Sequence, residues 1–495
     1  MKLNYNQYKD KVKACWIGKN IGGTLGAPYE GKKDFLSVTD FPANNTKALP
    51  NDDLDLQLVW LTALERLGVN RISAEDLSEF WLSYIVPPWN EYGICKTNIK
   101  TGLPAPLSGD YNNTWKNSNG AWIRTEIWAC LHPARPDIAC QFSIEDACVD
   151  HGSGEGTVSA VFVCAMQSAA FAVETARDCI DVALSKIPEN SRTYQTVQLA
   201  IKCYEEKKEL EEARNLIQQL NADIGSGWFE APSNVGYVVL GILYGEGDFK
   251  KSMLYAINCG DDTDCTAGTV GATLGILYGT KGLPKDWVKR VGDDIVTVAI
   301  NRCVIFNFPK TCTALTDRIC KLAVSASLSG DIYPLAISAC PRIEFVKEQG
   351  VSAEDAKKQM LSLNVCAERL KDITPNSFFK DLLFVNSKIT FTDGLTIKPN
   401  ESVKIQMRFT LNTEVTGNVP TYLGIRWWLP DGFTISGEKS VFVPGWSGWR
   451  ECPAYAYTEF TVTAGDNVCA FNKLVAEVTG EGRGRVGFIP ITLLG

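Results

Sequence analysis

Two clusters of aspartates, far apart in the sequence, are the residues best suited to do chemistry in this chain. One is Asn51-Asp52-Asp53-Leu54-Asp55 and the other is Asp261-Asp262-Thr263-Asp264, and each opens a segment with a helical pattern just after turn-forming residues. Because uncompensated carboxylates are very costly to bury, they make little sense as part of a core. Hard divalent cations such as Mg²⁺ and Mn²⁺ prefer oxygen ligands. We therefore expect folding to bring the two clusters together around such cations, in a metal-dependent hydrolase.

Each cluster taken singly also has a structural explanation. Asn51 can cap the helix that follows it and leave Asp52 and Asp53 in the first turn, where the helix dipole favours acidic side chains. Asp262 and Asp264 stand two residues apart at a helix start, so both can point at one site. The metal-site hypothesis therefore depends on the two clusters acting together.

Composition excludes several classes of protein. The chain has 495 residues, of which 45% are hydrophobic and 21% are charged, as expected for a soluble globular protein of two or three domains. A net charge of −8 argues against a general binder of nucleic acid or of acidic membranes. No apolar run is long enough to span a membrane, and the N-terminal residues lack an apolar signal core, so we expect a cytoplasmic protein.

Cysteine and histidine usage narrows the chemistry further. The 17 cysteines are an odd number without a C-x-x-C pair, so neither a disulfide framework nor a structural zinc site is expected. With only His132 and His151 in the chain, a His-rich metal site is excluded. Acid–base catalysis then falls to carboxylates or to water activated by a metal ion.

The hydrophobic pattern divides the chain into a helical part and a β part. Residues 1–372 place apolar side chains at helical spacing, which predicts an all-α catalytic domain. Near Pro375 the pattern changes to alternation with period two, as in Val403–Phe409, with turn signals between the alternating segments. Residues 376–495 therefore predict an all-β sandwich, whose role the sequence leaves unassigned.

Two features of this organisation have open interpretations. The segment 96–121 is rich in Gly, Pro and Asn and is long for a connector, so it is either a loop that faces a substrate or a plain excursion. The sandwich carries Trp427, Trp428, Trp446 and Trp449. These tryptophans fit a sugar-binding face, although core or interface positions are the commoner explanation.

Two glycine-rich segments accompany the acidic clusters. Gly18–Gly31 follows the first helical stripe and contains Glu30, an acid that by itself would be read as solvated surface. Asp150–Gly156 opens another helix, and its glycines expose backbone N–H groups that suit a phosphate or diphosphate. A simple loop-to-helix turn explains the second segment equally well on local grounds.

Taken together, these segments resemble the ADP-ribosylglycohydrolase family, whose founding bacterial member reactivates dinitrogenase reductase. The family pattern has a Gly-rich first loop ending in an acid, an early Thr-Asp-Asp and a late Gly-x-Asp-Thr-Asp-Thr. The matching segments here are Gly26–Glu30, Asn51–Asp53 and Gly260–Asp264. The resemblance covers about residues 10–290, with the same order and spacing, and the β domain lies outside it.

The resemblance implies an all-α domain that holds two Mg²⁺ or Mn²⁺ ions and cleaves the glycosidic bond to the ribose of ADP-ribose or a related substrate. The partner would be an ADP-ribosylated protein or a small ADP-ribose-like molecule, with no membrane or nucleic acid involved. The residues that the resemblance assigns are the metal ligands Asn51, Asp52, Asp53, Asp262 and Asp264, the catalytic carboxylates Glu30 and Asp53, and the substrate-binding residues His151, Gly152, Ser153 and Gly154.

Two positions depart from the family pattern. Asn51 stands where threonine is usual, and Cys265 stands where the late threonine ligand is usual. A thiol is a poor ligand for Mg²⁺, so the second metal position is the less secure. These departures motivate an alternative, a catalytically inactive protein that binds ADP-ribose or a nucleotide. Terpenoid synthases also bind diphosphate through Mg²⁺ and acidic helices, but their acids lie within long helices rather than at helix starts.

Overall fold

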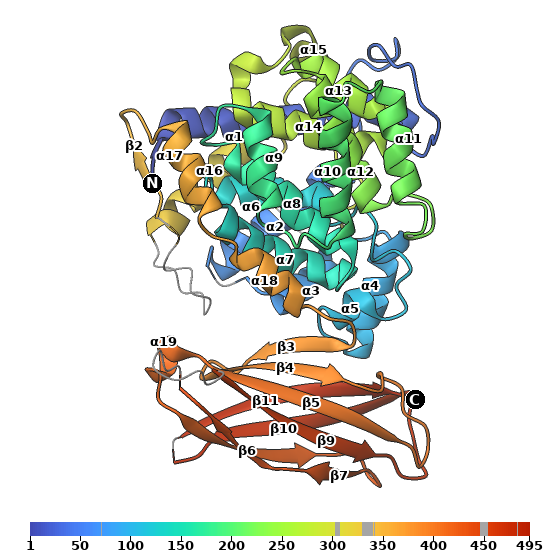
Figure 1. Ribbon diagram of the computed structural model, residues 1–495, viewed down its shortest axis with the longest axis vertical. Coiled ribbons are helices and arrows are strands. Elements are labelled where there is room, and N and C mark those ends of the chain that lie inside the picture. The colour runs from blue at the N-terminus through green and yellow to red at the C-terminus, as the bar shows by residue number, and fades with distance from the viewer. Residues whose placement is uncertain (71, 302–306, 329–339, 341, 446–453, 483) are drawn as a thin grey trace. The chain divides into compact units, whose positions relative to one another are not determined.

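The computed structural model describes residues 1–70, 72–301, 307–328, 340, 342–445, 454–482 and 484–495 (Figure 1). The chain forms two compact units. The first comprises Met1–Ile94 and Asn112–Asp372, and the second comprises Cys95–Tyr111 and Ile373–Gly495. The first unit is helical and the second is built on antiparallel sheets, which confirms the predicted fold class. Within the described ranges, no helix combines the length and apolar character needed to cross a membrane.

Six helices of the first unit position the residues of interest. They are α1 (Tyr5–Gly26), α2 (Asp52–Leu67), α7 (Pro136–His151), α8 (Glu155–Ala169), α12 (Ala231–Tyr244) and α14 (Thr263–Tyr278). Around them lie α3 (Ala74–Tyr84), α6 (Glu126–Leu131), α9 (Ala176–Leu184), α10 (Arg192–Glu205), α11 (Leu210–Leu220), α13 (Phe249–Asn258), α15 (Lys285–Val291), α16 (Cys312–Leu328), α17 (Ala353–Leu361) and α18 (Val365–Asp372). Short elements complete the unit: η1 (Ala27–Tyr29), η2 (Trp122–Arg124), η3 (Thr280–Gly282), and the parallel strands β1 (Lys2–Asn4) and β2 (Glu344–Val346).

Helices α1 and α14 pack against each other with unusually close backbones. Gly18 of α1 faces Gly271 of α14, and a methyl group on either glycine would overlap the other's carbonyl oxygen. Gly22 meets Ala267 in the same way. The glycines inside these helices therefore serve close packing. Because α1 continues to Gly26, most of the glycine-rich segment that the sequence placed after the first helix is part of that helix. This contact holds the start of α14 beside the end of α1.

Replacing Gly22 with alanine is expected to lower the free energy of unfolding by about 1–3 kcal/mol, because the added methyl group overlaps the Ala267 carbonyl. The substitution should destabilise even though alanine favours the helical backbone by up to about 1 kcal/mol. Chemical denaturation measures the change. Gly484→Ala is the control, since no atom lies within 4 Å of an added methyl group there. Equal stabilities of the two variants would contradict the close α1–α14 contact.

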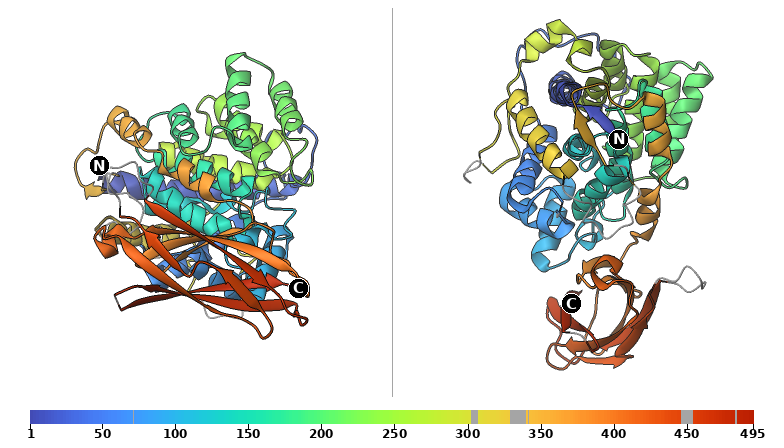
Figure 2. Two further views of the ribbon diagram at one scale, coloured as in Figure 1. Left: turned by 60° about the horizontal axis from the view of Figure 1, so that its bottom comes forward. Right: turned by 90° about the vertical axis from the view of Figure 1, so that its left-hand side faces the viewer.

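The second unit contains two antiparallel sheets that share one hydrophobic core (Figure 2). One sheet has the order β11-β10-β6-β8 and the other β3-β4-β5-β9-β7. The strands are β3 (Ser377–Asp381), β4 (Val385–Phe391), β5 (Ser402–Leu411), β6 (Thr421–Trp428), β7 (Thr434–Gly437), β8 (Ser440–Val443), β9 (Tyr455–Thr463), β10 (Phe471–Gly480) and β11 (Arg485–Leu494), with one helical turn, α19 (Thr413–Thr416). Their buried and exposed side chains alternate, as the period-two pattern predicted.

The tryptophans of this unit have different environments. Trp427 packs partly buried against the core, whereas Trp428 is half exposed and donates from Nε1 to Glu477 at 3.0 Å. Trp446 and Trp449 lie outside the described residues. The core explanation therefore holds for Trp427.

Most of the segment 96–121 packs within the β unit. It begins within α4 (Asn90–Thr101) and continues through α5 (Leu107–Asp110). Leu103 and Leu107 belong to the sandwich core, and Lys473 donates from Nζ to the Thr101 carbonyl at 2.7 Å. Residues 95–111 thus belong to the β unit, and the chain returns to the helical unit at Asn112.

Candidate functional site

Glu30 is held at the site by a short pairing with the second acidic cluster. Gly31 donates its N–H to the Asp261 carbonyl at 2.8 Å, and Asp261 donates to the Lys32 carbonyl at 2.6 Å. The Asp261 side chain is occupied elsewhere, because it accepts from Asn234 Nδ2 at 2.9 Å. Asp261 therefore fixes the turn, while Asp262, the next residue, faces Glu30.

The acids of the two clusters meet in the folded chain. Oxygens of Glu30, Asp262 and Asp264 lie within 4.8 Å of one another. Ligand atoms of Asp53, Asp264 and Cys265 also lie within 4.8 Å of one another, so Asp264 is common to both groups. Asp52, in the first turn of α2, is close enough to Asp262 for their charges to interact. The residues predicted from distant segments thus form one group.

Asp55 of the first cluster has a different task. Its Oδ2 accepts hydrogen bonds from the backbone N–H groups of Val298, at 2.6 Å, and Ala299, at 2.5 Å. The side chain is fully buried. Asp55 therefore anchors the segment after α15 and is not part of the candidate metal site.

Burial and mutual repulsion raise the pKa values of the clustered carboxyl groups. Desolvation, followed by repulsion from Asp53, raises the pKa of Asp52 to about 8. Desolvation, and then the Asp262 charge, raises the pKa of Glu30 to about 7, although the residue as a whole is exposed. The pKa values of Asp262 and Asp264 are raised well above their usual range, chiefly by desolvation. The site thus concentrates negative charge that a cation would stabilise.

The arrangement fits a hard divalent cation. Asp262 Oδ1 and Asp264 Oδ1 are buried and have no hydrogen-bond donor among the described residues. Buried carboxylate oxygens normally have a hydrogen-bond donor or a metal as partner. Together with Glu30 they offer the oxygen donors that Mg²⁺ and Mn²⁺ prefer.

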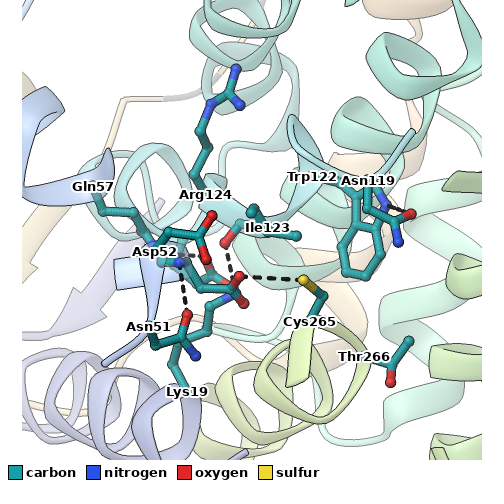
Figure 3. Close-up of polar contacts among 12 residues, drawn as sticks. Lys19, Asn51, Asp52, Gln57, Asn119, Trp122, Ile123, Arg124, Cys265 and Thr266 are labelled. Carbon is teal, nitrogen blue, oxygen red and sulfur yellow. Dashed lines mark hydrogen bonds and ion pairs between the residues drawn. The ribbon is translucent and has the colours of Figure 1, made fainter. Parts of the chain in front are cut away.

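Lys19, which the sequence did not single out, lies beside Asp53 at the edge of the acidic group; Figure 3 shows it near Asn51 and Asp52. Its Nζ is 3.0 Å from Asp53 Oδ2 and 3.2 Å from Glu126 Oε1, and all three side chains are fully buried. Burial alone would lower the pKa of Lys19, but the carboxylates of Asp53 and Glu126 raise it above its usual value. The sequence signal for Lys19 was its position among the glycines of α1, four residues after Cys15.

Asp53 is engaged on both of its oxygens. Its Oδ2 faces Lys19, and its Oδ1 accepts from Cys265 Sγ at 3.4 Å. Burial raises the pKa of Cys265 well above its usual range, which favours the protonated thiol. Asn51 Oδ1 accepts from the Asp53 backbone N–H at 2.7 Å, which confirms the predicted helix cap. The roles of Asn51 and Asp53 as metal ligands stay predictions.

Asn119 is a second residue of the site that the sequence analysis missed. Its Nδ2 donates to Asp262 Oδ2 at 2.8 Å, and its Oδ1 accepts from Trp122 Nε1 at 2.9 Å. The Asn117–Gly120 turn signal within the long loop was the available indication. Asn119 orients Asp262 and leaves the other oxygen of that carboxylate facing the acidic group.

The segment His151–Gly154 packs against the loop that carries Asn119. The His151 ring is fully buried, with Nδ1 3.0 Å from Asp150 Oδ1 and Nε2 3.2 Å from Ser118 Oγ. Gly154 lies so close to the loop that a methyl group there would overlap the Lys116 carbonyl. His151 therefore supports the loop that carries Asn119, and the predicted substrate-binding role of this segment stays a prediction.

Comparison with known proteins assigns the chain to a family. The ADP-ribosylglycohydrolase family profile matches residues 4–322. ADP-ribosylarginine hydrolase Tri1 of Pseudomonas putida (strain GB-1) is 39% identical over 62 residues, which are 11% of this chain and 17% of that protein. A solved structure described as an ADP-ribosylglycohydrolase-related protein complex aligns with 65% of this chain and 98% of its own, at 17% identity and a TM-score of 0.40. Because the family match spans more than half of the chain, this protein belongs to the ADP-ribosylglycohydrolase family, as its motifs predicted.

Proposed function

We propose that this chain hydrolyses the glycosidic bond to the ribose of ADP-ribose, or of a related ADP-ribosylated substrate, with the help of divalent cations. The observation that carries the proposal is the convergence of Glu30, Asp262 and Asp264, whose oxygens lie within 4.8 Å of one another. Family membership favours the same activity. The short match to an ADP-ribosylarginine hydrolase makes ADP-ribosylarginine the first substrate to assay.

The residues that would hold a cation are Glu30, Asp262 and Asp264, with Asp52 beside them. Their oxygens suit Mg²⁺ or Mn²⁺, and the family pattern implies two such ions. The chemistry that a divalent cation supplies in such a site is Lewis acidity toward ribose oxygens and acidification of an attacking water. The cytoplasmic location and the lack of a nucleic-acid partner stay predictions of the sequence.

The two carboxylates proposed as catalytic have different environments. Asp53 is buried between Lys19 and Cys265, and both of its oxygens are engaged. Glu30 is exposed beside the acidic group, and burial of its carboxyl group together with the Asp262 charge raises its pKa to about 7. We therefore propose that Glu30 takes the proton of the water that attacks the anomeric carbon. Asp53 instead remains a buried negative charge paired with Lys19.

Replacing Glu30 with glutamine is expected to lower kcat by about 10²–10⁴-fold, the usual contribution of a general acid or base. Release of ADP-ribose from an ADP-ribosylarginine peptide, followed by chromatography in saturating Mn²⁺, measures it. The exposed Asp34→Asn, in the same loop, is the matched control and should keep full activity. Undiminished turnover in Glu30→Gln would remove Glu30 from the mechanism. Tight ADP-ribose binding by the unaltered protein, with no turnover on any ADP-ribosylated substrate, would instead identify an inactive binding protein.

A further inference from the structure

The Lys19 ammonium has a complete set of partners inside the helical unit. Besides the two carboxylates, its Nζ donates to the Ile123 carbonyl at 2.6 Å (Figure 3). Three oxygens lie within 3.2 Å of the ammonium: the Ile123 carbonyl, which accepts a hydrogen bond, and Asp53 Oδ2 and Glu126 Oε1, which form ion pairs. The position of the charge is therefore fixed by the fold.

The neighbouring carboxylate Glu126 is also fully engaged. Its Oε1 accepts from Gln167 Nε2 and its Oε2 from Gln57 Nε2, each at 2.8 Å. Its only charged partner among the described contacts is Lys19, at 3.2 Å. Glu126 thus belongs to the Lys19 pocket and offers no free oxygen to a second cation.

Gly268 of α14 leaves space for the Lys19 side chain. A methyl group at Gly268 would lie 3.2 Å from Asp53 Oδ2 and 3.3 Å from Lys19 Cδ. Both distances are tighter than ordinary van der Waals contact, so a larger residue would crowd the lysine stem and the carboxylate together. The absence of a side chain at Gly268 leaves room for the Lys19–Asp53 ion pair.

The site has two sides, which differ in whether the protein itself neutralises their carboxylate oxygens. On the Asp53 side, the positive charge is already supplied by Lys19, and the neighbouring Cys265 offers sulfur, which is a poor ligand for Mg²⁺ or Mn²⁺. On the other side, no donor in the described part of the chain reaches the buried Asp262 Oδ1 or Asp264 Oδ1. Among the interactions of the described residues, no lysine or arginine charge is paired with Asp262 or Asp264.

We propose that Lys19 acts as a permanent cation in this site, so that the chain binds one divalent ion, at Glu30, Asp262 and Asp264, and none at Asp53. The inference rests on the divalent-cation binding in the proposed function, and it concerns the number of ions. Lys19 then has a positioning role, because it holds Asp53 without touching the substrate.

Metal stoichiometry of the full, unaltered chain tests the inference. Titration with Mn²⁺ in a calorimeter should give one ion per chain. The EPR spectrum of the loaded protein should be that of an isolated Mn²⁺ ion and not of an exchange-coupled pair. Two ions per chain with a coupled spectrum would overturn the inference and leave the proposed function standing. No Mn²⁺ binding at all would instead overturn the cation-dependent function on which the inference rests.

Substitutions test whether Lys19 is the reason that one divalent ion binds instead of two. Lys19→Met/Glu126→Gln removes one positive and one negative buried charge together and leaves Asp53 with a free oxygen, so the stoichiometry should rise from one ion to two. Lys19→Arg keeps the charge and should still bind one ion. Lys11→Met is the matched control, since Lys11 is a partly buried lysine of α1 that contacts only the backbone carbonyls of Ala170 and Phe171 in the described hydrogen bonds. One ion in a folded double variant would overturn the role of Lys19, and if that variant does not fold, the stoichiometry and EPR spectrum of the unaltered chain decide.

Discussion

Replacing Asp262 with alanine should reduce ADP-ribose release by at least about 10³-fold, because the loss of a cation-holding carboxylate removes several kcal/mol of transition-state stabilisation. Asp262 immediately precedes α14, and its buried Oδ1 receives no hydrogen bond from the residues that the structure describes. Its Oδ2 accepts from Asn119, which orients the carboxylate toward Glu30 and Asp264. Steady-state rates on an ADP-ribosylarginine peptide in excess Mn²⁺ measure the loss.

A matched aspartate separates this loss from a general effect of removing acids from helix starts. Asp248 caps α13, where its Oδ1 accepts from the Lys251 N–H at 2.9 Å. Asp248→Ala should cost about 1 kcal/mol of stability through the lost cap and leave kcat/KM unchanged. Full activity in Asp262→Ala, or an equal loss in both variants, would contradict a cation site at Asp262.

Replacing Arg124 with methionine should lower the free energy of unfolding by about 3–5 kcal/mol, because it leaves buried carboxylates without their counterion. Arg124 is fully buried, with Nε 2.9 Å from Asp146 Oδ1 and Nη2 2.7 Å from Asp150 Oδ1. Figure 3 shows the guanidinium directed away from Lys19, so it serves a separate group of acids. The effect should appear in urea denaturation followed by the helical circular dichroism signal.

A surface arginine that also pairs with two carboxylates provides the comparison. Arg177 is 3.0 Å from both Asp181 Oδ1 and Glu205 Oε1, but its side chain is 43% exposed. Solvent screens such pairs, so Arg177→Met should cost less than about 1 kcal/mol. Equal losses of unfolding free energy in the two variants would contradict the stabilisation expected from the buried ion pairs of Arg124.

Features that depend on neighbouring residues could be predicted from the sequence. The cap at Asn51 and the acids at the starts of α2 and α14 follow from local spacing. Strand alternation in the β unit follows from period-two burial in the same way. Local chemistry therefore sufficed for the fold class and for most of the acidic group.

Features that depend on distant contacts could not be predicted. Lys19 looks like any helical lysine until Asp53 and Glu126 are placed around it by α2 and α6. Asp55 cannot be told from Asp52 and Asp53 until the 298–299 backbone reaches it. The packing of residues 95–111 on the β unit also depends on strands that follow much later in the chain. Such roles arise from tertiary partners, which one sequence does not reveal.

Anomalous diffraction from a crystal soaked with Mn²⁺ and ADP-ribose tests the central claim most directly, because it locates the metal without reference to activity. We expect an anomalous peak bounded by Glu30, Asp262 and Asp264, with the ribose of the ligand beside it. A crystal in which ADP-ribose is bound but manganese is absent from these carboxylates, or lies elsewhere in the chain, would contradict it.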